Sequence, residues 1–504
     1  MSFLYENAVV AYTAIVISLM AWIFGGTRAE LLLPVVPWIV VFLWEMMLCF
    51  PQRHSGESLY NARRRTWKAM RHDPLVWTAL GFMALLLVPF VNNGLCPVCD
   101  YDKITLGINP DPPVRFLPFC VNRLHHLNVV EWFAVALSVT VAVKHSLRRR
   151  GKRLLVEMLV WNGAALALLG FVQSAAGAPG PFWAELPDGR KAGDFFSSFG
   201  YPNMAGDYFT TVFALAVAAW HNRREDVLED IAASEVSDGK DRRGVFWRKH
   251  FFVLPAAVCF FAALNTLSRA SIILVTSLAA IFFVYTFISF TAKKSKAFRI
   301  KSGVWCALAL GLMVFFSTVF MPENIRREVD TLNTAAVLDR VTGKGQYHVR
   351  VATEIWKEYP LFGCGGWGYR HFCIPKMTEA EYKDIQRVGG INVHNDYLQF
   401  LAEHGIIGFG AILAMFAMLC WPVGVAWHAL VKAARFAKPK DLPPKPVQLF
   451  VMPSSVFFIL AAVAATVIHG FGDCPLRSPA VLSLFFASLA AMPGYIPKLN
   501  LEKE

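Results

Sequence analysis

Charge is scarce in this sequence. Only 17% of the 504 residues are charged, whereas 56% are apolar and 41 are phenylalanine. This composition does not suit a soluble surface and excludes a chain made mainly of soluble domains. The phosphate-binding Walker loop, the HExxH zinc motif and the nucleophile elbow are also absent. We therefore expect no cofactor and no metal.

Long apolar runs are what the chain has instead. A membrane core of ~30 Å is crossed by ~20 helical residues, and twelve stretches qualify: 8–24, 31–50, 74–92, 127–145, 154–176, 205–220, 251–267, 270–290, 303–321, 405–427, 451–470 and 478–495. We predict an all-α polytopic membrane protein with about 12 transmembrane helices and a large, partly helical periplasmic loop before helix 10.

The basic residues indicate an orientation. With the N-terminus inside, every Lys- and Arg-rich connection falls on the cytoplasmic side, as membrane proteins prefer. Both termini are then cytoplasmic, and the first segment, which lacks a basic region and a cleavage site, is expected to remain as a helix. The net charge of +13 is spread over separate short loops, so it favours membrane lipids as partners and no nucleic acid.

The predicted organisation has three parts. Residues 1–321 hold helices 1–9, residues 322–404 form the periplasmic loop that carries site residues, and residues 405–504 hold helices 10–12 and a cytoplasmic tail. Within the loop, 340–359 has helical spacing, and 395–404 is predicted to form a short helix that Gly405 ends.

Six of the ten cysteines map to the outer side of the predicted topology. An even number on an oxidising face favours disulfides, whose pairing the sequence leaves open. Cys96 and Cys99 have CxxC spacing, but no second CxxC or histidine pair accompanies them, which favours a structural role over a metal or redox site. The other four are Cys120, Cys364, Cys373 and Cys474.

Polar residues that could carry chemistry gather on the same outer face. A neutral imidazole at His394 could act as a general base, while arginines could stabilise a phosphate. Most of these residues also have a structural interpretation: an interfacial arginine for Arg269, a solvated helix charge for Arg350, a capping asparagine for Asn203 and a bystander in a polar loop for His394. Asp473 and Arg477 could be a mutually paired loop charge. The set comprises Asn203, Arg269, Arg350, His394, Asn395, Asp396, Asp473 and Arg477.

Five ordered signatures give these residues a context. They are SFGYPNMAGDY, NTLSRAS, RVATEIWKEYPLFGCGGWGYRHF, VHNDYLQFLAEHGIIG and IHGFGDCPLRSP. In order and sidedness the chain resembles the O-antigen ligase and O-antigen polymerase family, the lipid-linked oligosaccharide glycosyltransferases of the bacterial inner membrane. The Cys-rich segment around Cys96, Cys99 and Cys120 is not part of that resemblance.

The resemblance implies a metal-independent, inverting glycosyltransferase. Its donor would be a glycan on undecaprenyl pyrophosphate, and its acceptor the lipid A core on the periplasmic face. It implies that Arg269 and Arg350 bind the pyrophosphate and that His394 activates the acceptor, with Asp473 in support. Three other functions stay open: an O-antigen polymerase, a protein O-oligosaccharyltransferase and, from another class, a lipid-sugar transporter, for which charges near the bundle centre would be expected.

Overall fold

The computed structural model describes residues 2–51, 53–54, 56–92, 97–100, 103–108, 114, 116–185, 195–233, 242–291, 295–304, 346–388, 391–436 and 452–496. This part of the chain is almost entirely helical, in agreement with the predicted class. Helices occupy the predicted apolar runs with one exception, the run 303–321, most of which lies outside the described residues. The helices are α1 (Ser2–Trp22), α3 (Val36–Cys49), α5 (Pro74–Leu87), α6 (Arg123–Ser146), α7 (Arg149–Ala175), α8 (Pro202–Ala233), α10 (Val253–Asn265), α11 (Arg269–Thr291), α18 (Asp396–Phe436), α19 (Ser454–His469) and α20 (Pro479–Ala491).

Fewer than twelve of the described helices are long enough to cross a membrane. Five described helices are long and apolar enough to cross a membrane, and α4 (Leu59–Arg71) with α5 would make a sixth if this bent pair forms one span. Four more are apolar but shorter. The figure of twelve transmembrane helices thus stays a prediction.

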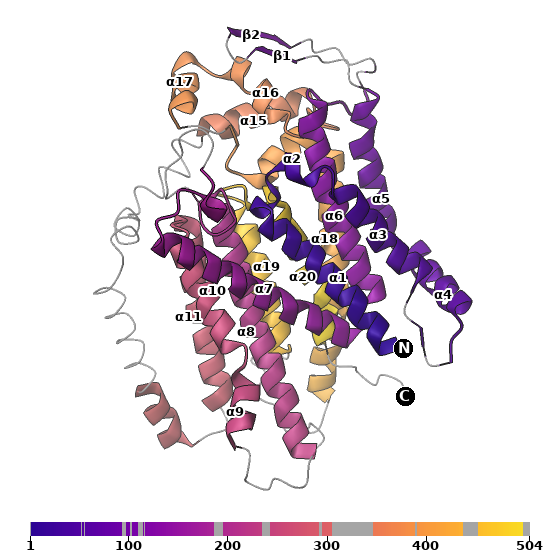
Figure 1. Cartoon of the computed structure of the whole chain (residues 1–504), viewed down its shortest axis with the longest axis vertical. Helices are drawn as coiled ribbons and strands as arrows, with labels where there is room; N and C mark the ends of the chain where they lie inside the picture. The colour runs from indigo at the N-terminus through magenta and orange to yellow at the C-terminus, as the bar shows by residue number, and fades with distance from the viewer. Residues whose placement is uncertain are drawn as a thin grey trace.

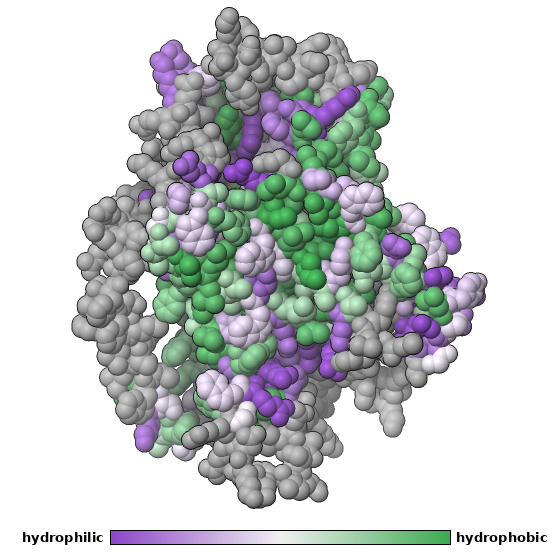
Figure 2. Space-filling view, viewed as in Figure 1, coloured by the Kyte–Doolittle hydropathy of each residue, from purple (hydrophilic) through white to green (hydrophobic). Residues whose placement is uncertain are grey.

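The bundle is built around α6 and α8. α8 packs against α7, α10, α11 and α19, and α6 packs against α1, α3, α5 and α20 (Figure 1). Their buried side chains belong to one apolar core. Figure 2 shows an apolar band across the middle of the visible face, with hydrophilic side chains above and below it. A helical bundle that meets lipid around its middle has this pattern.

A smaller helical cap lies at one end of the bundle, at the top of Figure 1. It consists of α15 (Gln346–Glu358), α16 (Tyr369–Phe372) and α17 (Glu379–Val388). The cap has its own apolar cluster, in which Val351 and Ile355 of α15 pack with Phe119 and with Ala402 of α18. Beside it, β1 (Pro97–Asp100) and β2 (Lys103–Ile108) form an antiparallel hairpin that we did not predict, although Ile104, Leu106 and Ile108 have strand periodicity.

α18 is broken near its start. Gly405 has φ 63° and ψ −173°, so the helix 396–404 is separate from the long helix that follows. The loop 360–365 restores the lost backbone hydrogen bonds, with Cys364 N to Ala402 O 3.0 Å, Gly365 N to Glu403 O 2.8 Å, Ile406 N to Pro360 O 2.9 Å and Ile407 N to Leu361 O 3.1 Å. The predicted short helix that ends at Gly405 is confirmed.

The disulfides expected on the outer side are not formed among the four cysteines whose side chains the structure describes. Cys120, Cys364, Cys373 and Cys474 are free and buried. Three of them contact oxygen acceptors instead: Cys120 Sγ lies 3.7 Å from Pro89 O, Cys373 Sγ lies 3.5 Å from Arg370 O and Cys474 Sγ lies 3.7 Å from Gln399 Oε1. These thiols act as small core groups. The placement of Cys96 and the side chain of Cys99 lie outside the described part.

Candidate functional site

His394 stands at the junction of the cap and the bundle, directly before the short helix 396–404. Its φ of 53° is left-handed, which is uncommon for a residue with a side chain. Its side chain is 44% exposed. Asn395 fixes this turn, because its Oδ1 accepts from Leu398 N at 3.0 Å and its Nδ2 donates to Phe471 O at 3.2 Å. The imidazole is therefore presented to the outside from a rigid backbone.

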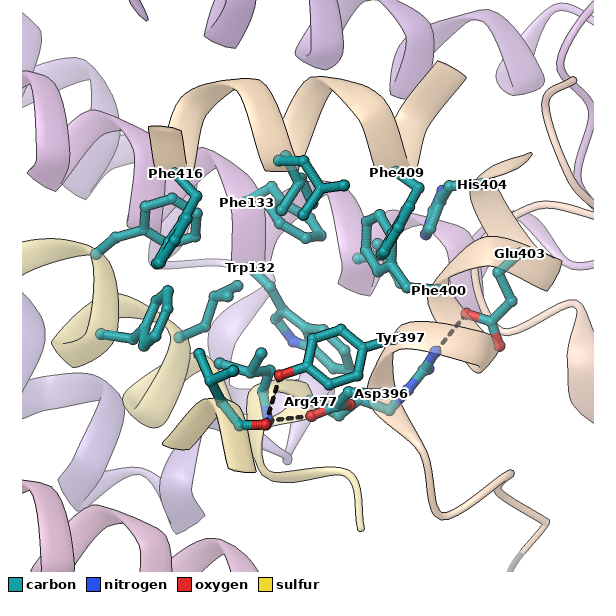
Figure 3. Close-up of a pocket in the computed structure, with 18 residues that line it drawn as sticks. Trp132, Phe133, Asp396, Tyr397, Phe400, Glu403, His404, Phe409, Phe416 and Arg477 are labelled. Atoms are coloured by element: carbon teal, nitrogen blue, oxygen red, sulfur yellow. Dashed lines mark hydrogen bonds and ion pairs between the residues drawn. The ribbon is translucent and has the colours of Figure 1, made fainter. Parts of the chain in front are cut away.

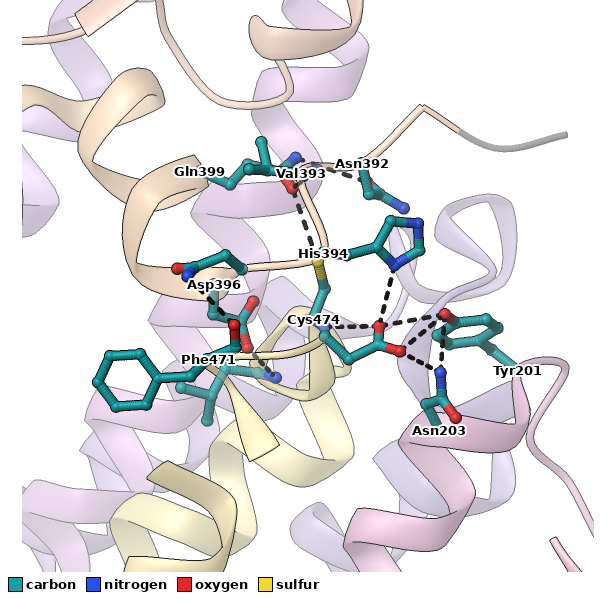
Figure 4. Close-up of polar contacts among 12 residues, drawn as sticks. Tyr201, Asn203, Asn392, Val393, His394, Asp396, Gln399, Phe471 and Cys474 are labelled. Atoms are coloured by element: carbon teal, nitrogen blue, oxygen red, sulfur yellow. Dashed lines mark hydrogen bonds and ion pairs between the residues drawn. The ribbon is translucent and has the colours of Figure 1, made fainter. Parts of the chain in front are cut away.

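Asp473 is the partner of His394. Its Oδ1 lies 3.5 Å from His394 Nδ1 and accepts a 2.7 Å hydrogen bond from Cys474 N. Tyr201 Oη donates to the same carboxylate at 3.1 Å, and Asn203 Nδ2 donates to both Asp473 Oδ2 and Tyr201 Oη (Figure 4). Three segments far apart in the sequence thus meet at one buried carboxylate.

Electrostatics keep this carboxylate ionised. Burial would raise the pKa of Asp473, but its interaction with His394 and the charge of His469 lower it below the ordinary value. Burial and the charge of Asp473 raise the pKa of Tyr201 well above its usual value, so the phenol remains a hydrogen-bond donor. An imidazole that donates from Nδ1 to Asp473 has its lone pair at Nε2. Such an imidazole can take a proton from a hydroxyl that reaches it.

Asp396 is buried, unlike the half-exposed His394 two residues before it. It is 6% exposed; its backbone N–H donates to Gly470 O at 2.9 Å and its Oδ2 accepts from Leu476 N at 2.9 Å. These bonds join the short helix to the turn 470–478. Asp396 therefore fixes the turn that carries Asp473.

Arg477 is buried on the inner side of the same short helix. Its guanidinium forms a 2.7 Å ion pair with the fully buried carboxylate of Glu403 and stacks 4.6 Å from the Trp367 ring centroid. Gln399 Nε2 donates to the other oxygen of Glu403 at 3.1 Å. Arg477 is thus engaged within the fold by Glu403 and Trp367.

Arg269 is half-buried at the start of α11. The turn before it is held by Leu267 at φ 59° and by a 3.0 Å hydrogen bond between the hydroxyls of Ser268 and Ser271. A Cβ atom on Gly206 of α8 would collide with Ser271 and Thr266. The NTLSRAS turn therefore packs directly on α8, about one helical turn after Asn203.

Arg350 faces an acidic patch on the cap. It is 43% exposed and forms ion pairs with Glu354 at 3.0 Å and Glu381 at 2.9 Å. These hydrogen bonds raise the pKa of Arg350. Another residue of α15, His348, lies beside the candidate base: its ring centroid is 6.0 Å from that of His394, and its Nδ1 lies 2.9 Å from Tyr369 Oη. Two positions apart on a helix, His348 and Arg350 point in different directions.

A second histidine–carboxylate pair lies within the bundle. His469 Nδ1 and Asp207 Oδ1 are 3.0 Å apart and both side chains are fully buried, while Thr466 donates to Asp207 Oδ2 at 2.9 Å. Asp473 N donates to His469 O at 3.0 Å. This pair ties α8 to α19 directly beneath the turn that carries Asp473.

An apolar cavity of about 180 Å³ lies between α6, α18 and α20 (Figure 3). Trp132, Phe133, Phe400, Phe409 and Phe416 are among its lining residues. Its polar lining residues are Asp396, Tyr397, Glu403, His404 and Arg477. The cavity can thus hold a hydrocarbon chain near a polar group.

Sequence reasoning missed several of these residues. Tyr201, Asp207 and His469 stand within the signatures but were not singled out, and His348 stands just before Arg350. Within the described residues, no group of three or more His, Cys, Asp or Glu side chains could hold a metal ion.

Comparison with known proteins gives a family. No curated protein matches the chain. Residues 254–413 match the family model described as O-antigen ligase. This match includes Arg269, Arg350 and His394, and the family supports glycosyltransferase activity of the ligase and polymerase type. Residues 254–413 of the chain are therefore similar to the O-antigen ligase family, as the signatures in that range indicated.

Proposed function

We propose that this protein is a ligase that transfers a glycan from undecaprenyl pyrophosphate to the lipid A core sugar. In this proposal it acts on the periplasmic face of the bacterial inner membrane, by inversion and without a metal. The observation that carries the proposal is the contact between His394 and the buried, ionised Asp473 at the outer end of the bundle. A base, a group that orients it and a nearby arginine turn are the parts that such a transfer needs.

The reaction is a single displacement. Nε2 of His394 takes the proton of the acceptor hydroxyl as its oxygen attacks the anomeric carbon. The new glycosidic bond forms while the bond from that carbon to the pyrophosphate oxygen breaks. Undecaprenyl pyrophosphate leaves with the electron pair, and Asp473 stabilises the imidazolium that forms.

In this proposal Arg269 binds the leaving pyrophosphate. Its turn packs against α8, and Tyr201 and Asn203, at the start of that helix, hold Asp473. Arg350 would have to exchange Glu354 and Glu381 for a phosphate oxygen. The cavity beneath the short helix has the lining to hold part of the isoprenoid chain of the donor.

The test is transfer by the purified protein in nanodiscs. It uses an undecaprenyl-pyrophosphate glycan, lipid A core as acceptor and a chelator throughout. We expect glycosylated lipid A core from the wild type and none from His394→Ala or Arg269→Ala. Full activity of both variants would contradict the proposal, and activity abolished by the chelator would contradict the metal-independent step.

The same assay separates the alternatives. Lengthened lipid-linked glycan would identify a polymerase, and product only with a protein acceptor would identify a protein O-oligosaccharyltransferase. Transport predicts movement of the donor across the membrane without a new glycosidic bond. Each of these outcomes would replace the ligase assignment.

A further inference from the structure

The helix α4 is a basic surface that the proposed transfer reaction does not use. Five basic residues and no acidic residue occur within Leu59–Arg71. Only a narrow stripe, Ala62, Thr66 and Met70, is buried. The remaining positions are exposed or half-exposed, so most of the helix surface is open and positively charged. The basic residues are Arg63, Arg64, Arg65, Lys68 and Arg71.

Large aromatic side chains accompany this charge. Tyr60 is 72% exposed and Trp67 is 56% exposed on α4 itself. Trp77, at the start of α5, is 57% exposed and donates its indole N–H to Arg71 O at 2.7 Å. Exposed Trp and Tyr beside Lys and Arg are typical of the boundary between lipid headgroups and hydrocarbon.

The geometry places α4 along such a boundary. α4 is bent by 70° relative to the apolar helix that begins at Pro74. A helix at this angle to an apolar helix that enters the membrane lies close to the membrane plane. In Figure 1, α4 projects sideways from the body, near the N-terminus and away from α15 and α16.

A cluster of charged side chains fixes the bend between α4 and α5. Asp73, which is 8% exposed, accepts from Leu75 N at 3.0 Å and so caps α5. Its other oxygen lies 2.7 Å from both Lys144 Nζ and His145 Nε2 at the end of α6. Burial would raise the pKa of Asp73, but these partners lower it to about 2. The carboxylate therefore stays charged at neutral pH, and α4 is held in a fixed direction.

We propose that α4 binds the headgroups of anionic phospholipids. Arg64, Lys68 and Arg71 would bind the phosphates, while Trp67 and Tyr60 would lie at the level of the glycerol. Arg65 is partly neutralised by Glu57 at 3.0 Å, and Arg63 Nε donates to Cys49 O at 2.8 Å. The exposed aromatic residues and the direct continuation into α5 favour a lipid surface over a nucleic acid or an acidic protein.

The test is lipid binding by the full-length protein, measured by native mass spectrometry. Phosphatidylglycerol and phosphatidylcholine with the same acyl chains are compared. We expect the wild type to prefer phosphatidylglycerol and the triple variant R64Q/K68Q/R71Q to lose at least about tenfold in affinity for it. The matched control is K296Q/R299Q/K301Q, which removes the same charge from the exposed segment 295–304.

The outcomes are distinct. Loss of preference in the α4 variant and its retention in the control would support the proposal. Equal loss in both would mean that net charge alone attracts the lipid, and no loss in either would also overturn the α4 site.

A single substitution tests the same proposal if the triple variant folds poorly. Trp67→Phe keeps all charges and should reduce quenching of tryptophan fluorescence by phosphatidylglycerol brominated near the headgroup. Unchanged quenching would contradict the proposed position of α4. None of these measurements depends on glycan transfer, so they can fail while the proposed ligase activity holds.

Discussion

At the scale of single residues, three strained backbone positions fall within the sequence signatures. Leu267 and Trp367 both have φ 59° and His394 has φ 53°, while Ser197, with φ 58°, directly precedes the first signature. A left-handed residue with a side chain costs roughly 1–2 kcal/mol, and such strain tends to persist at functional sites. The turns that surround the proposed site therefore contain backbone strain, which lowers the stability of the fold.

The carboxylate that orients His394 gives the first prediction. Asp473→Asn keeps the shape of the side chain but removes the charge that stabilises an imidazolium, so transfer at pH 7 should fall by about 100-fold or more. Tyr201→Phe removes one hydrogen bond to the same carboxylate and should cost about tenfold. The measurement is the initial rate of transfer with saturating donor. A smaller effect for Asp473→Asn than for Tyr201→Phe would contradict the role given to Asp473.

The pKa of Asp473 also gives a pH dependence of stability. Because the folded pKa is lowered, the stabilisation is fully present above the unfolded value of about 3.9 and is lost as pH falls through the folded value. Unfolding measured in detergent should show a full contribution from Asp473 that does not change with pH between pH 5 and 8. Below about pH 4, Asp473→Asn should lose stability less steeply than the wild type.

At the scale of elements, the break in α18 is the feature with the tightest steric demand. A Cβ atom on Gly405 would collide with the backbone of Leu361 and Phe362, and its φ is 63°. Gly405→Ala should therefore lower the stability of the protein by several kcal/mol or prevent folding.

Gly410 is the matched control in the same helix. A Cβ atom at Gly410 meets nothing within 4 Å, so Gly410→Ala should be neutral or stabilising by up to ~1 kcal/mol. The comparison is made by thermal unfolding in one detergent. Similar melting temperatures for the two variants would show that the loop 360–365 adapts to the extra carbon.

The cap helices α15 and α17 lead to a prediction about Arg350. If Arg350 binds the pyrophosphate, Glu381→Gln weakens its competing ion pair and should lower the KM for the donor, whereas Arg350→Gln should raise it. Exposed ion pairs are worth ~0.2–1 kcal/mol, so the change from Glu381→Gln should be fivefold or less. If KM is unchanged in both variants, Arg350 serves only to join α15 to α17.

Local features of the fold could be predicted from the sequence, whereas contacts between distant segments could not. Apolar runs of helical length located the helices, and Gly405 marked the end of the short helix, because both signals are local. The pairing of Asp473 with His394 and Tyr201 depends on three segments that meet only in the folded chain. The free cysteines and the engagement of Arg350 and Arg477 by carboxylates depend on such contacts too, so residue type and sidedness alone did not predict them.

At the scale of the whole molecule, the fully buried pair Asp207–His469 joins α8 and α19. Breaking a buried ion pair on one side leaves the other group without its counter-charge. Asp207→Leu should thus destabilise the protein by roughly 3–5 kcal/mol. Thermal unfolding of this variant, of His469→Leu and of the double variant checks the effect.

The double variant separates stability from function. Asp207→Leu with His469→Leu removes both polar groups and should recover much of the lost stability. Transfer by the double variant should stay low, because the turn that carries Asp473 begins at His469. Recovery of activity along with stability would show that the pair does not position Asp473.

The proposed site is assembled across the boundary of the family match. His394 lies within residues 254–413, but Asp473 and its donors Tyr201 and Asn203 lie outside them. Exchange of residues 254–413 between two relatives would bring a foreign histidine onto a resident carboxylate. Such a chimera would be active only if the turn 470–478 and the start of α8 still hold Asp473 against the new histidine. If the proposed site carries out the transfer, the unit that can be moved from one protein to another is thus larger than residues 254–413, the part that matches the family model.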